Sequence, residues 1–327
     1  MKSTLEYLLQ GNSLNENESS TILKDIIAQK YNAVQTAAFL TIYSMRQTTE
    51  AELLGFRKAL VQLSGKIKVQ HPTLDIVGTG GDDKNTFNIS TLAAFVCAGA
   101  GVYITKHGNF GYSSITGSSD VLQYLGFNMA DTEKEVQQQL DLAKFSFLHA
   151  PTFHPALKNI AEVRASLNIK TIFNLLGPLI NPVHPRYNLI GVNSRKNGTL
   201  IHSILKSMDT RFLIIYSLDG YDELSLTADA ITWDKKSSIN NLDIKKMAGS
   251  YLKPESLVGG KNTAENARIF MNVLQLKATP EQHKVVLYNA ALGIQLYHGN
   301  SFNAALEMAE DSMLGKKALK CFELLKK

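Results

Sequence analysis

Apolar residues in the first part of the chain recur every three or four positions, the spacing of one face of an α-helix. Up to about residue 65, Tyr7-Leu8-Leu9, Ile22-Leu23 and Ala37-Ala38-Phe39-Leu40 follow this spacing, without the alternation typical of strands. Thr49 stands three residues before Glu52, the arrangement of a capping box at a helix start. We therefore expect a small all-helical domain here.

After Lys66 the pattern changes to short apolar runs that alternate with amphipathic segments. The apolar runs predict strands at 74–77, 102–104, 145–148, 187–192 and 211–217. The amphipathic segments predict helices at 90–100, 120–125, 132–144, 199–207, 263–277, 280–297 and 302–325. A further helix is expected around Arg164, and an irregular β segment at 230–252. Strand–helix–strand succession predicts an α/β domain with a central, mostly parallel sheet flanked by helices. The apolar segment 171–179 is either a short buried helix or one that faces a partner.

A glycine-rich stretch follows the first predicted strand. Residues 78–91 read Gly-Thr-Gly-Gly-Asp-Asp-Lys-Asn-Thr-Phe-Asn-Ile-Ser-Thr and run into a predicted helix start. Glycines allow a ligand to approach the backbone closely, and a helix N-terminus offers free N–H groups to an anion. An ordinary strand-to-helix turn is the alternative. The spacing fits neither the dinucleotide fingerprint nor the nucleoside triphosphate loop, so we interpret the stretch as one wall of a phosphate site.

Two further polar segments follow predicted strands. Residues 105–119 are rich in glycine and hydroxyl residues and carry Lys106 as a point charge. Asp222 and Glu223 follow the strand at 211–217, and adjacent carboxylates suggest a divalent cation bound through oxygen. A flexible surface loop and a solvated turn are the respective alternatives. Because ligands of parallel sheets bind at the carboxyl ends of the strands, loops 78–91 and 105–119 are expected at one edge.

The composition of the 327 residues narrows the class of protein. The formal net charge of +5 suits an anionic small molecule, and no basic stripe with interleaved aromatic residues suggests nucleic acid. Cys97 and Cys321 lack metal-ligand spacing and are read as free thiols of a reducing compartment. The longest apolar run, 92–104, is shorter than the roughly 20 residues of a membrane span. We expect a cytoplasmic protein with no membrane partner.

Several motifs occur in the same order as in a known enzyme family. They are Gly78-Thr79-Gly80-Gly81-Asp82 with Asn88-Ile89-Ser90-Thr91, Lys106-His107-Gly108-Asn109, Gly117-Ser118-Ser119-Asp120, His154-Pro155-Ala156, Arg164, Thr171-Ile172-Phe173-Asn174, Leu176-Gly177-Pro178-Leu179 and Asp222-Glu223-Leu224-Ser225. With these motifs the chain resembles the anthranilate phosphoribosyltransferases over essentially its whole length. The resemblance implies transfer of the phosphoribosyl group of 5-phosphoribosyl 1-diphosphate (PRPP) to the amine of anthranilate in tryptophan biosynthesis.

The resemblance also implies an architecture and an assembly. A small helical domain would comprise residues 1–65, with 167–185 returning to it, and would serve dimerisation. The α/β domain would comprise residues 66–166 and 186–327 and would bind PRPP. We expect a homodimer that acts on two small-molecule substrates.

By the same resemblance the site residues fall into three groups. Those expected to bind PRPP are Gly78, Gly81, Asp82, Thr86, Asn88, Ile89, Ser90, Thr91, Lys106, His107, Gly108, Asn109, Ser113, Ser114 and Ser118. Gly78, Asn109 and Arg164 are expected at anthranilate, and Ser90 with Asp222 and Glu223 would hold two Mg²⁺ ions. An aromatic amine is neutral at pH 7, so no strong base is required, and His107 is only a candidate proton acceptor.

Two positions depart from the family pattern. Phe110 and Ile115 stand where many members have arginine and lysine. We interpret this as subfamily variation; weaker substrate affinity and compensation by another cation are the alternatives. A pyrimidine nucleoside phosphorylase would need no acid pair at 222–223, and a non-catalytic nucleotide- or nucleic-acid-binding paralogue fits poorly with the weak net charge and Arg164.

Overall fold

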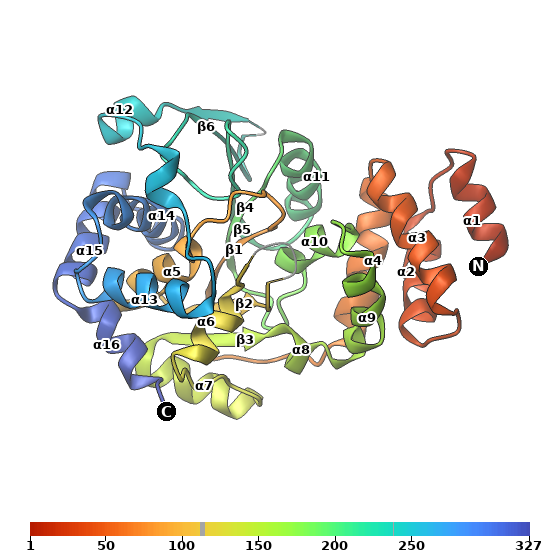
Figure 1. Cartoon of the computed structure of the whole chain (residues 1–327), viewed down its shortest axis with the longest axis horizontal. Coiled ribbons are helices and arrows are strands. Elements are labelled where there is room, and N and C mark those ends of the chain that lie inside the picture. The colour runs from red at the N-terminus through yellow and green to blue at the C-terminus, as the bar shows by residue number, and fades with distance from the viewer. Residues whose placement is uncertain (112–114, 238) are drawn as a thin grey trace. The chain divides into compact units, whose positions relative to one another are not determined.

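The computed structural model describes residues 1–111, 115–237 and 239–327, and it divides the chain into two compact units (Figure 1). The helical unit consists of Met1–Ile67 and Ala150–His184, and the α/β unit of Lys68–His149 and Pro185–Lys327. The predicted class, helical domain plus α/β domain, is confirmed. Among the described residues, no helix is long and apolar enough to cross a membrane.

Four helices from the start of the chain and a later segment form the helical unit. They are α1 (Lys2–Leu9), α2 (Glu16–Ile27), α3 (Ala33–Met45) and α4 (Glu50–Leu63), joined by α8 (Ala150–Phe153), η1 (Pro155–Leu157), α9 (Lys158–Leu167), α10 (Ile172–Leu176) and η2 (Gly177–Leu179). The returning segment begins at Ala150, earlier than the predicted 167. The reason is long-range packing: α9 lies against α2 and α3, and Asn159 Nδ2 donates to the Ile27 carbonyl at 3.0 Å.

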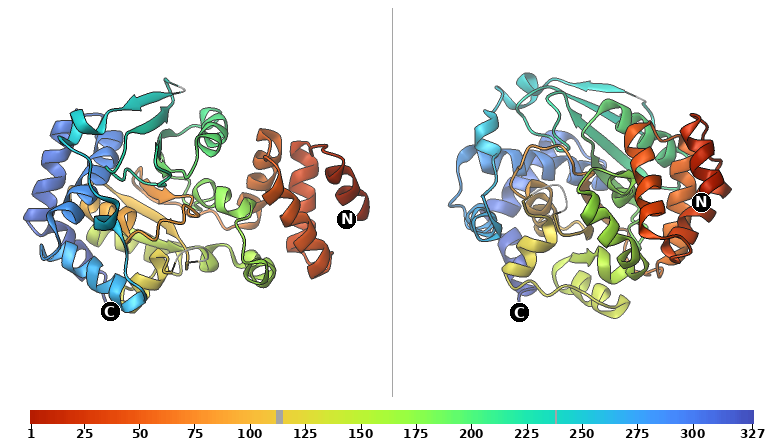
Figure 2. Two further views of the ribbon diagram at one scale, coloured as in Figure 1. Left: turned by 45° about the horizontal axis from the view of Figure 1, so that its top comes forward. Right: turned by 45° about the vertical axis from the view of Figure 1, so that its right-hand side comes forward.

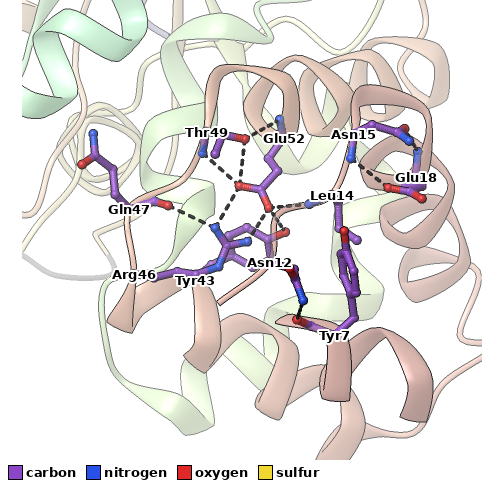
Figure 3. Close-up of polar contacts among 10 residues, drawn as sticks. All are labelled: Tyr7, Asn12, Leu14, Asn15, Glu18, Tyr43, Arg46, Gln47, Thr49 and Glu52. Atoms are coloured by element: carbon purple, nitrogen blue, oxygen red, sulfur yellow. Dashed lines mark hydrogen bonds and ion pairs between the residues drawn. The ribbon is translucent and has the colours of Figure 1, made fainter. Parts of the chain in front are cut away.

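A buried glutamate ties the first helices together (Figure 3). Glu52 is fully buried and accepts from the Leu14 N–H at 3.0 Å, from the Tyr43 hydroxyl at 2.9 Å and from the Arg46 guanidinium. It also forms the predicted capping box with Thr49 at the start of α4, which is confirmed. Burying a charge is costly unless it is paired and hydrogen-bonded, and here both conditions are met.

The α/β unit is built on one seven-stranded sheet with the strand order β3-β2-β1-β4-β5-β6-β7. Figure 2 shows this unit from two further directions. Its strands are β1 (Leu74–Gly78), β2 (Ile104–Gly108), β3 (Phe145–His149), β4 (Tyr187–Gly191), β5 (Arg211–Ser217), β6 (Ala230–Asp234) and β7 (Asn240–Leu242). Strands β3, β2, β1, β4 and β5 are neighbours in this order, and each neighbouring pair is parallel. β6 pairs antiparallel with β5, and β7 pairs antiparallel with β6. The carboxyl ends of the first five strands therefore share one edge.

Helices cover the sheet on both faces. They are α5 (Ile89–Gly99), α6 (Ser118–Tyr124), α7 (Glu133–Ala143), α11 (Arg195–Lys206), α12 (Ile244–Ala248), η3 (Pro254–Leu257), α13 (Thr263–Leu274), α14 (Pro280–His298), α15 (Phe302–Leu314) and α16 (Lys317–Leu324). Helices α5 and α14 pack together on the sheet, and α11 lies on the opposite side (Figure 1). Phe95 of α5 stacks on Phe145 with ring centroids 4.0 Å apart, and this pair lies in the core.

Two predicted boundaries are wrong. Strand β2 begins at Ile104, not at 102, and extends to Gly108, so Lys106 and His107 are strand residues rather than loop residues. They are polar but buried, which hides the strand from a hydrophobic pattern. The helix predicted at 302–325 is two helices, because Lys316 adopts a left-handed backbone (φ 56°) between α15 and α16.

Candidate active site

The glycine-rich loop leaves the end of β1 with an unusual backbone. Gly80 and Gly81 have φ of 70° and 73°, a conformation that residues with a side chain rarely adopt. The Gly80 N–H donates to Asp222 Oδ2 at 2.6 Å. A Cβ at Gly78 would collide with the same carboxylate. The small residues of the loop are thus needed for the close approach of Asp222.

The acid pair follows β5 and is held by its own neighbours. The Ser217 hydroxyl donates to the Glu223 carbonyl at 2.7 Å. Asn289 of α14 donates to the Leu224 carbonyl at 2.8 Å and accepts the Leu224 N–H at 3.1 Å. Gly191 at the end of β4 leaves no room for a Cβ beside the Asp222 carbonyl. These contacts bring the two carboxylates to the edge where the glycine loop begins.

A direct link joins the acid pair to the start of α5. Glu223 Oε1 accepts the Ser90 N–H at 3.1 Å. Lys106 of β2 is buried beneath this point, where its Nζ donates to the Ile76 carbonyl and lies 3.4 Å from Ser90 Oγ. Three segments that are distant in sequence, at 78–91, 106 and 222–223, therefore meet. The edge rule for parallel sheets predicted this for the loops at 78–91 and 105–119, but not for the acid pair.

Carboxyl groups crowd at this junction, where burial disfavours their charged forms. Burial raises the pKa of Asp222 to about 7, and the charge of Asp82 adds to the shift. Burial, then Asp222 and Asp82, raise the pKa of Glu223 well above its usual range. Burial also lowers the pKa of Lys106, against the opposing effect of Asp75, Glu223 and Asp222. Ionising these carboxyl groups is costly without a nearby positive charge, so a cation bound at the junction would favour their charged forms.

The donor atoms present fit Mg²⁺. Asp82 Oδ2, Asn88 Oδ1 and Glu223 Oε2 are buried without a hydrogen-bond partner in the described part of the chain. Oxygen donors of this kind are the ligands Mg²⁺ prefers. Within residues 1–111, 115–237 and 239–327, no group of three or more His, Cys, Asp or Glu side chains forms a ready metal site. Mg²⁺ usually keeps several waters and is bound through few carboxylates together with substrate phosphates.

The second polar loop is closed by Asp120. Its Oδ2 accepts the N–H groups of Gly111 at 2.8 Å and Gly117 at 2.7 Å. Ser118 begins α6, and a Cβ at Gly108 would collide with its hydroxyl. The predicted site residues Ser113 and Ser114 lie outside the described residues. The loop is thus anchored at both ends by backbone contacts to one carboxylate.

The remaining predicted site residues differ in their burial and in their hydrogen bonds. Ile89 and Thr91 are buried on α5, which leaves their backbone for any ligand contact. Thr86 forms an isolated bridge with Val258. The backbone N–H of buried His107 donates to Asp75 Oδ1 at 3.2 Å. Asn109 Oδ1 accepts the Phe110 N–H at 2.8 Å.

The two positions that depart from the family pattern are both exposed. Phe110 is 38% exposed, and its ring meets His149 edge-on with centroids 4.8 Å apart; Ile115 is 52% exposed. Arg164 belongs to the helical unit, where its guanidinium lies 4.9 Å from the ring centroid of Phe173. Gly78 and Asn109, the other residues expected at anthranilate, belong to the α/β unit.

Three residues that position the site were given no role in the sequence analysis. They are Asp120, which was quoted only as part of a motif, and Asn193 and Asn289, which were not singled out. The place of Asp120 in the first turn of a helix and the place of Asn193 just after a parallel strand were usable signals. Asn289 lies in the middle of a long helix, and no local pattern marks it.

Known proteins share both this fold and these motifs. Residues 2–64 match a family model described as the helical bundle domain of a glycosyl transferase family, and residues 70–319 match the a/b domain of that family. The anthranilate phosphoribosyltransferase of Cytophaga hutchinsonii is 42% identical, and the match covers 99% of each chain. The chain belongs to the anthranilate phosphoribosyltransferase family.

Solved anthranilate phosphoribosyltransferases have the same fold. The enzyme from Saccharomyces cerevisiae in complex with PRPP and Mg is 27% identical and superposes with a TM-score of 0.90, covering 99% of this chain and 96% of that one. The same yeast enzyme in complex with 4-fluoroanthranilate gives a TM-score of 0.86 at 27% identity and the same coverage. The predicted family is therefore confirmed.

Proposed function

We propose that this protein transfers the phosphoribosyl group of PRPP to the amine of anthranilate in tryptophan biosynthesis, giving N-(5-phosphoribosyl)anthranilate and diphosphate. In this reaction the bond between the anomeric carbon and diphosphate breaks, and its electron pair leaves with the diphosphate. A bond from the anomeric carbon to the amine nitrogen forms, and the amine loses a proton. The observation that carries the proposal is the meeting of a glycine-rich loop with the Asp222–Glu223 pair, in a chain of this family.

The PRPP-binding part of the proposal rests on the α/β unit. We assign the diphosphate and ribose to the loop from Gly78 to Thr91 and to the segment from Lys106 to Ser118. The free backbone of a glycine loop and a helix start suit phosphate oxygens. Lys106 is buried next to Ser90. Its positive charge would therefore stabilise a bound phosphate from within the protein and not through an exposed side chain.

For the metal, Ser90, Asp222 and Glu223 would hold two Mg²⁺ ions together with the diphosphate. When bound, Mg²⁺ would offset the charge of the leaving diphosphate. The unpartnered side-chain oxygen of Glu223 and the crowding of carboxyl groups, which raises the pKa of Glu223, support this assignment. The task of the protein is to place the acid pair so that PRPP and metal are received together.

Arg164, Asn109 and the backbone at Gly78 would receive anthranilate. A guanidinium pairs well with a carboxylate, and the Asn109 side chain is polar and next to the glycine of β2. His107 would have at most a late role as a proton acceptor, because the amine is neutral before attack. Displacement then depends on orientation and charge neutralisation more than on a base.

We further propose that the helical unit mediates a homodimer. Leu9, Val34 and Met45 are 73%, 79% and 83% exposed in this chain. The exposure of three large apolar side chains on one small unit is the observation that supports this proposal.

The test of the proposed function is a direct assay. Purified protein, PRPP, anthranilate and MgCl₂ should yield fluorescent phosphoribosylanthranilate, and EDTA should abolish the product. Phosphate-dependent cleavage of thymidine or uridine, with no product from anthranilate, would instead establish the nucleoside phosphorylase.

A further inference from the structure

Asn193 lies two residues past the end of β4 and reaches the glycine-rich loop. β4 and β1 are paired in register up to Gly78 and Gly191, so residues after each strand are close neighbours. Asn193 Nδ2 donates to the carbonyl of Gly80 at 3.0 Å and to that of Gly81 at 3.1 Å. One side-chain amide thus holds two consecutive carbonyls of the loop.

The orientation of the Asn193 amide is determined by its surroundings. Asn197 Nδ2 donates to Asn193 Oδ1 at 2.8 Å. If the oxygen and nitrogen of Asn193 were exchanged, an oxygen would face two carbonyl oxygens, and an NH₂ would face another NH₂. Asn197 is itself placed by the start of α11, where its N–H donates to the Ser194 hydroxyl at 3.3 Å. Helix α11 therefore orients Asn193, and Asn193 orients the loop.

Holding the two carbonyls also directs the N–H groups of the loop. In a trans peptide the carbonyl and the N–H of the following residue point to opposite sides, and no cis peptide bond occurs among the residues that the structure describes. The N–H groups of Gly81 and Asp82 consequently point away from Asn193. The Gly80 N–H is already taken by Asp222. Two N–H groups are thus offered on one side of a loop that is held from β4 and from the acid pair.

We propose that Asn193 is a positioning residue for PRPP: it holds the loop so that the N–H groups of Gly81 and Asp82 meet the diphosphate. This rests on the proposed function, since it takes PRPP as the ligand of the loop. Glycines at positive φ lose much backbone freedom on ordering. Asn193 removes that freedom before the ligand arrives, so that binding does not have to supply the ordering.

The test compares substitutions of Asn193, which follows β4, with a substitution of Asn188 near the start of β4. Asn193→Ala removes the donor, and Asn193→Asp keeps the shape but puts a carboxylate against two carbonyls. Asn188→Ala is the matched control, because Asn188 is a buried asparagine near the start of β4, at the end away from the loop, and its amide donates to Thr210 Oγ1 at 2.7 Å. Steady-state KM values for PRPP and anthranilate, and the affinity for magnesium diphosphate by calorimetry, are measured for each.

Loss of two neutral hydrogen bonds should raise the KM for PRPP and the dissociation constant of diphosphate about 10- to 100-fold. We expect Asn193→Asp to be the more affected variant, the KM for anthranilate to change less than about twofold, and Asn197→Ala to give a smaller shift of the same kind. Asn188→Ala should leave the ratio of the two KM values unchanged. The wild-type protein must first be active. If Asn193→Ala then changed both KM values equally, or left the affinity for magnesium diphosphate unchanged, the role of Asn193 would be overturned. An inactive wild type would refute the proposed function instead.

Discussion

The Gly80 N–H and the Asp222 carboxylate, 142 residues apart in sequence, are joined by a hydrogen bond of 2.6 Å. The carboxylate also lies where a Cβ of Gly78 would be. The glycine-rich loop and the acid pair are therefore in direct contact. A substitution in either one should alter the position of the other and so reduce activity.

Gly78→Ala should disable the site without unfolding the protein. Its Cβ would displace the Asp222 carboxylate, and a displacement of about 1 Å can cost about 100-fold in rate. Assays of kcat/KM with circular dichroism measure both effects. Gly65→Ala, where a Cβ meets open space, is the control and should be fully active. A fully active Gly78→Ala enzyme would contradict the close packing of this junction.

The acid pair should govern the response to magnesium. The double variant Asp222→Asn with Glu223→Gln keeps the shape but removes both charges, so activity should be lost and only partly restored by excess Mg²⁺. Titration of activity with MgCl₂ is the measurement. Asp229→Asn, an acid of the same segment that accepts the Tyr251 hydroxyl at 2.9 Å, should keep the wild-type magnesium response. Unchanged magnesium dependence in the double variant would refute the metal role.

Arg164→Ala should affect one substrate more than the other. If the guanidinium meets the anthranilate carboxylate, the loss of a charge-assisted contact should raise the KM for anthranilate about tenfold or more, with little change for PRPP. Steady-state kinetics with each substrate varied in turn measure this. Arg186→Ala, which removes an exposed arginine paired with Asp209, should leave both KM values unchanged. Equal effects of Arg164→Ala on both substrates would remove Arg164 from the acceptor site.

Glu52→Gln should destabilise the helical unit. The change removes the buried partner of Arg46 and leaves a part-buried cation unpaired, at a cost of about 3 kcal/mol in the free energy of unfolding. Urea unfolding followed by circular dichroism gives this difference. Glu50→Gln, an exposed change on the same helix, should alter stability by less than about 0.5 kcal/mol. A Glu52→Gln protein as stable as wild type would show that the network is dispensable.

His154 should make stability depend on pH. Burial, helped by the nearby His184, lowers the pKa of His154 to about 4, although the Ile180 carbonyl opposes the shift. Below the usual histidine pKa of about 6.5, His154 is protonated in the unfolded chain but stays neutral in the folded chain down to about pH 4. The free energy of unfolding therefore decreases as pH falls from about 6.5 to about 4. Between pH 7.5 and 5, wild type should lose about 2 kcal/mol more than His154→Gln. Parallel pH profiles of the two proteins would contradict the buried neutral imidazole.

Local signals account for what could be predicted along the chain. The capping box of Thr49 and Glu52 and the strand at Leu74 depend on residues close in sequence, and both were recognised. The glycine-rich loop was recognised for the same reason, since its glycines and helix start are contiguous. The edge rule for parallel sheets then placed the loops at 78–91 and 105–119 at one edge without coordinates.

By itself, then, the sequence determined the elements, the fold class and the segments that form the site, because these follow from local periodicity and strand direction. Only the tertiary structure decided that Lys106 is buried beneath Ser90, that Asn193 holds the carbonyls of Gly80 and Gly81, and that the return to the helical unit begins at Ala150. Each of these depends on contacts between residues far apart in sequence. Such contacts arise from packing and from the pairing of buried polar groups, which no local pattern encodes.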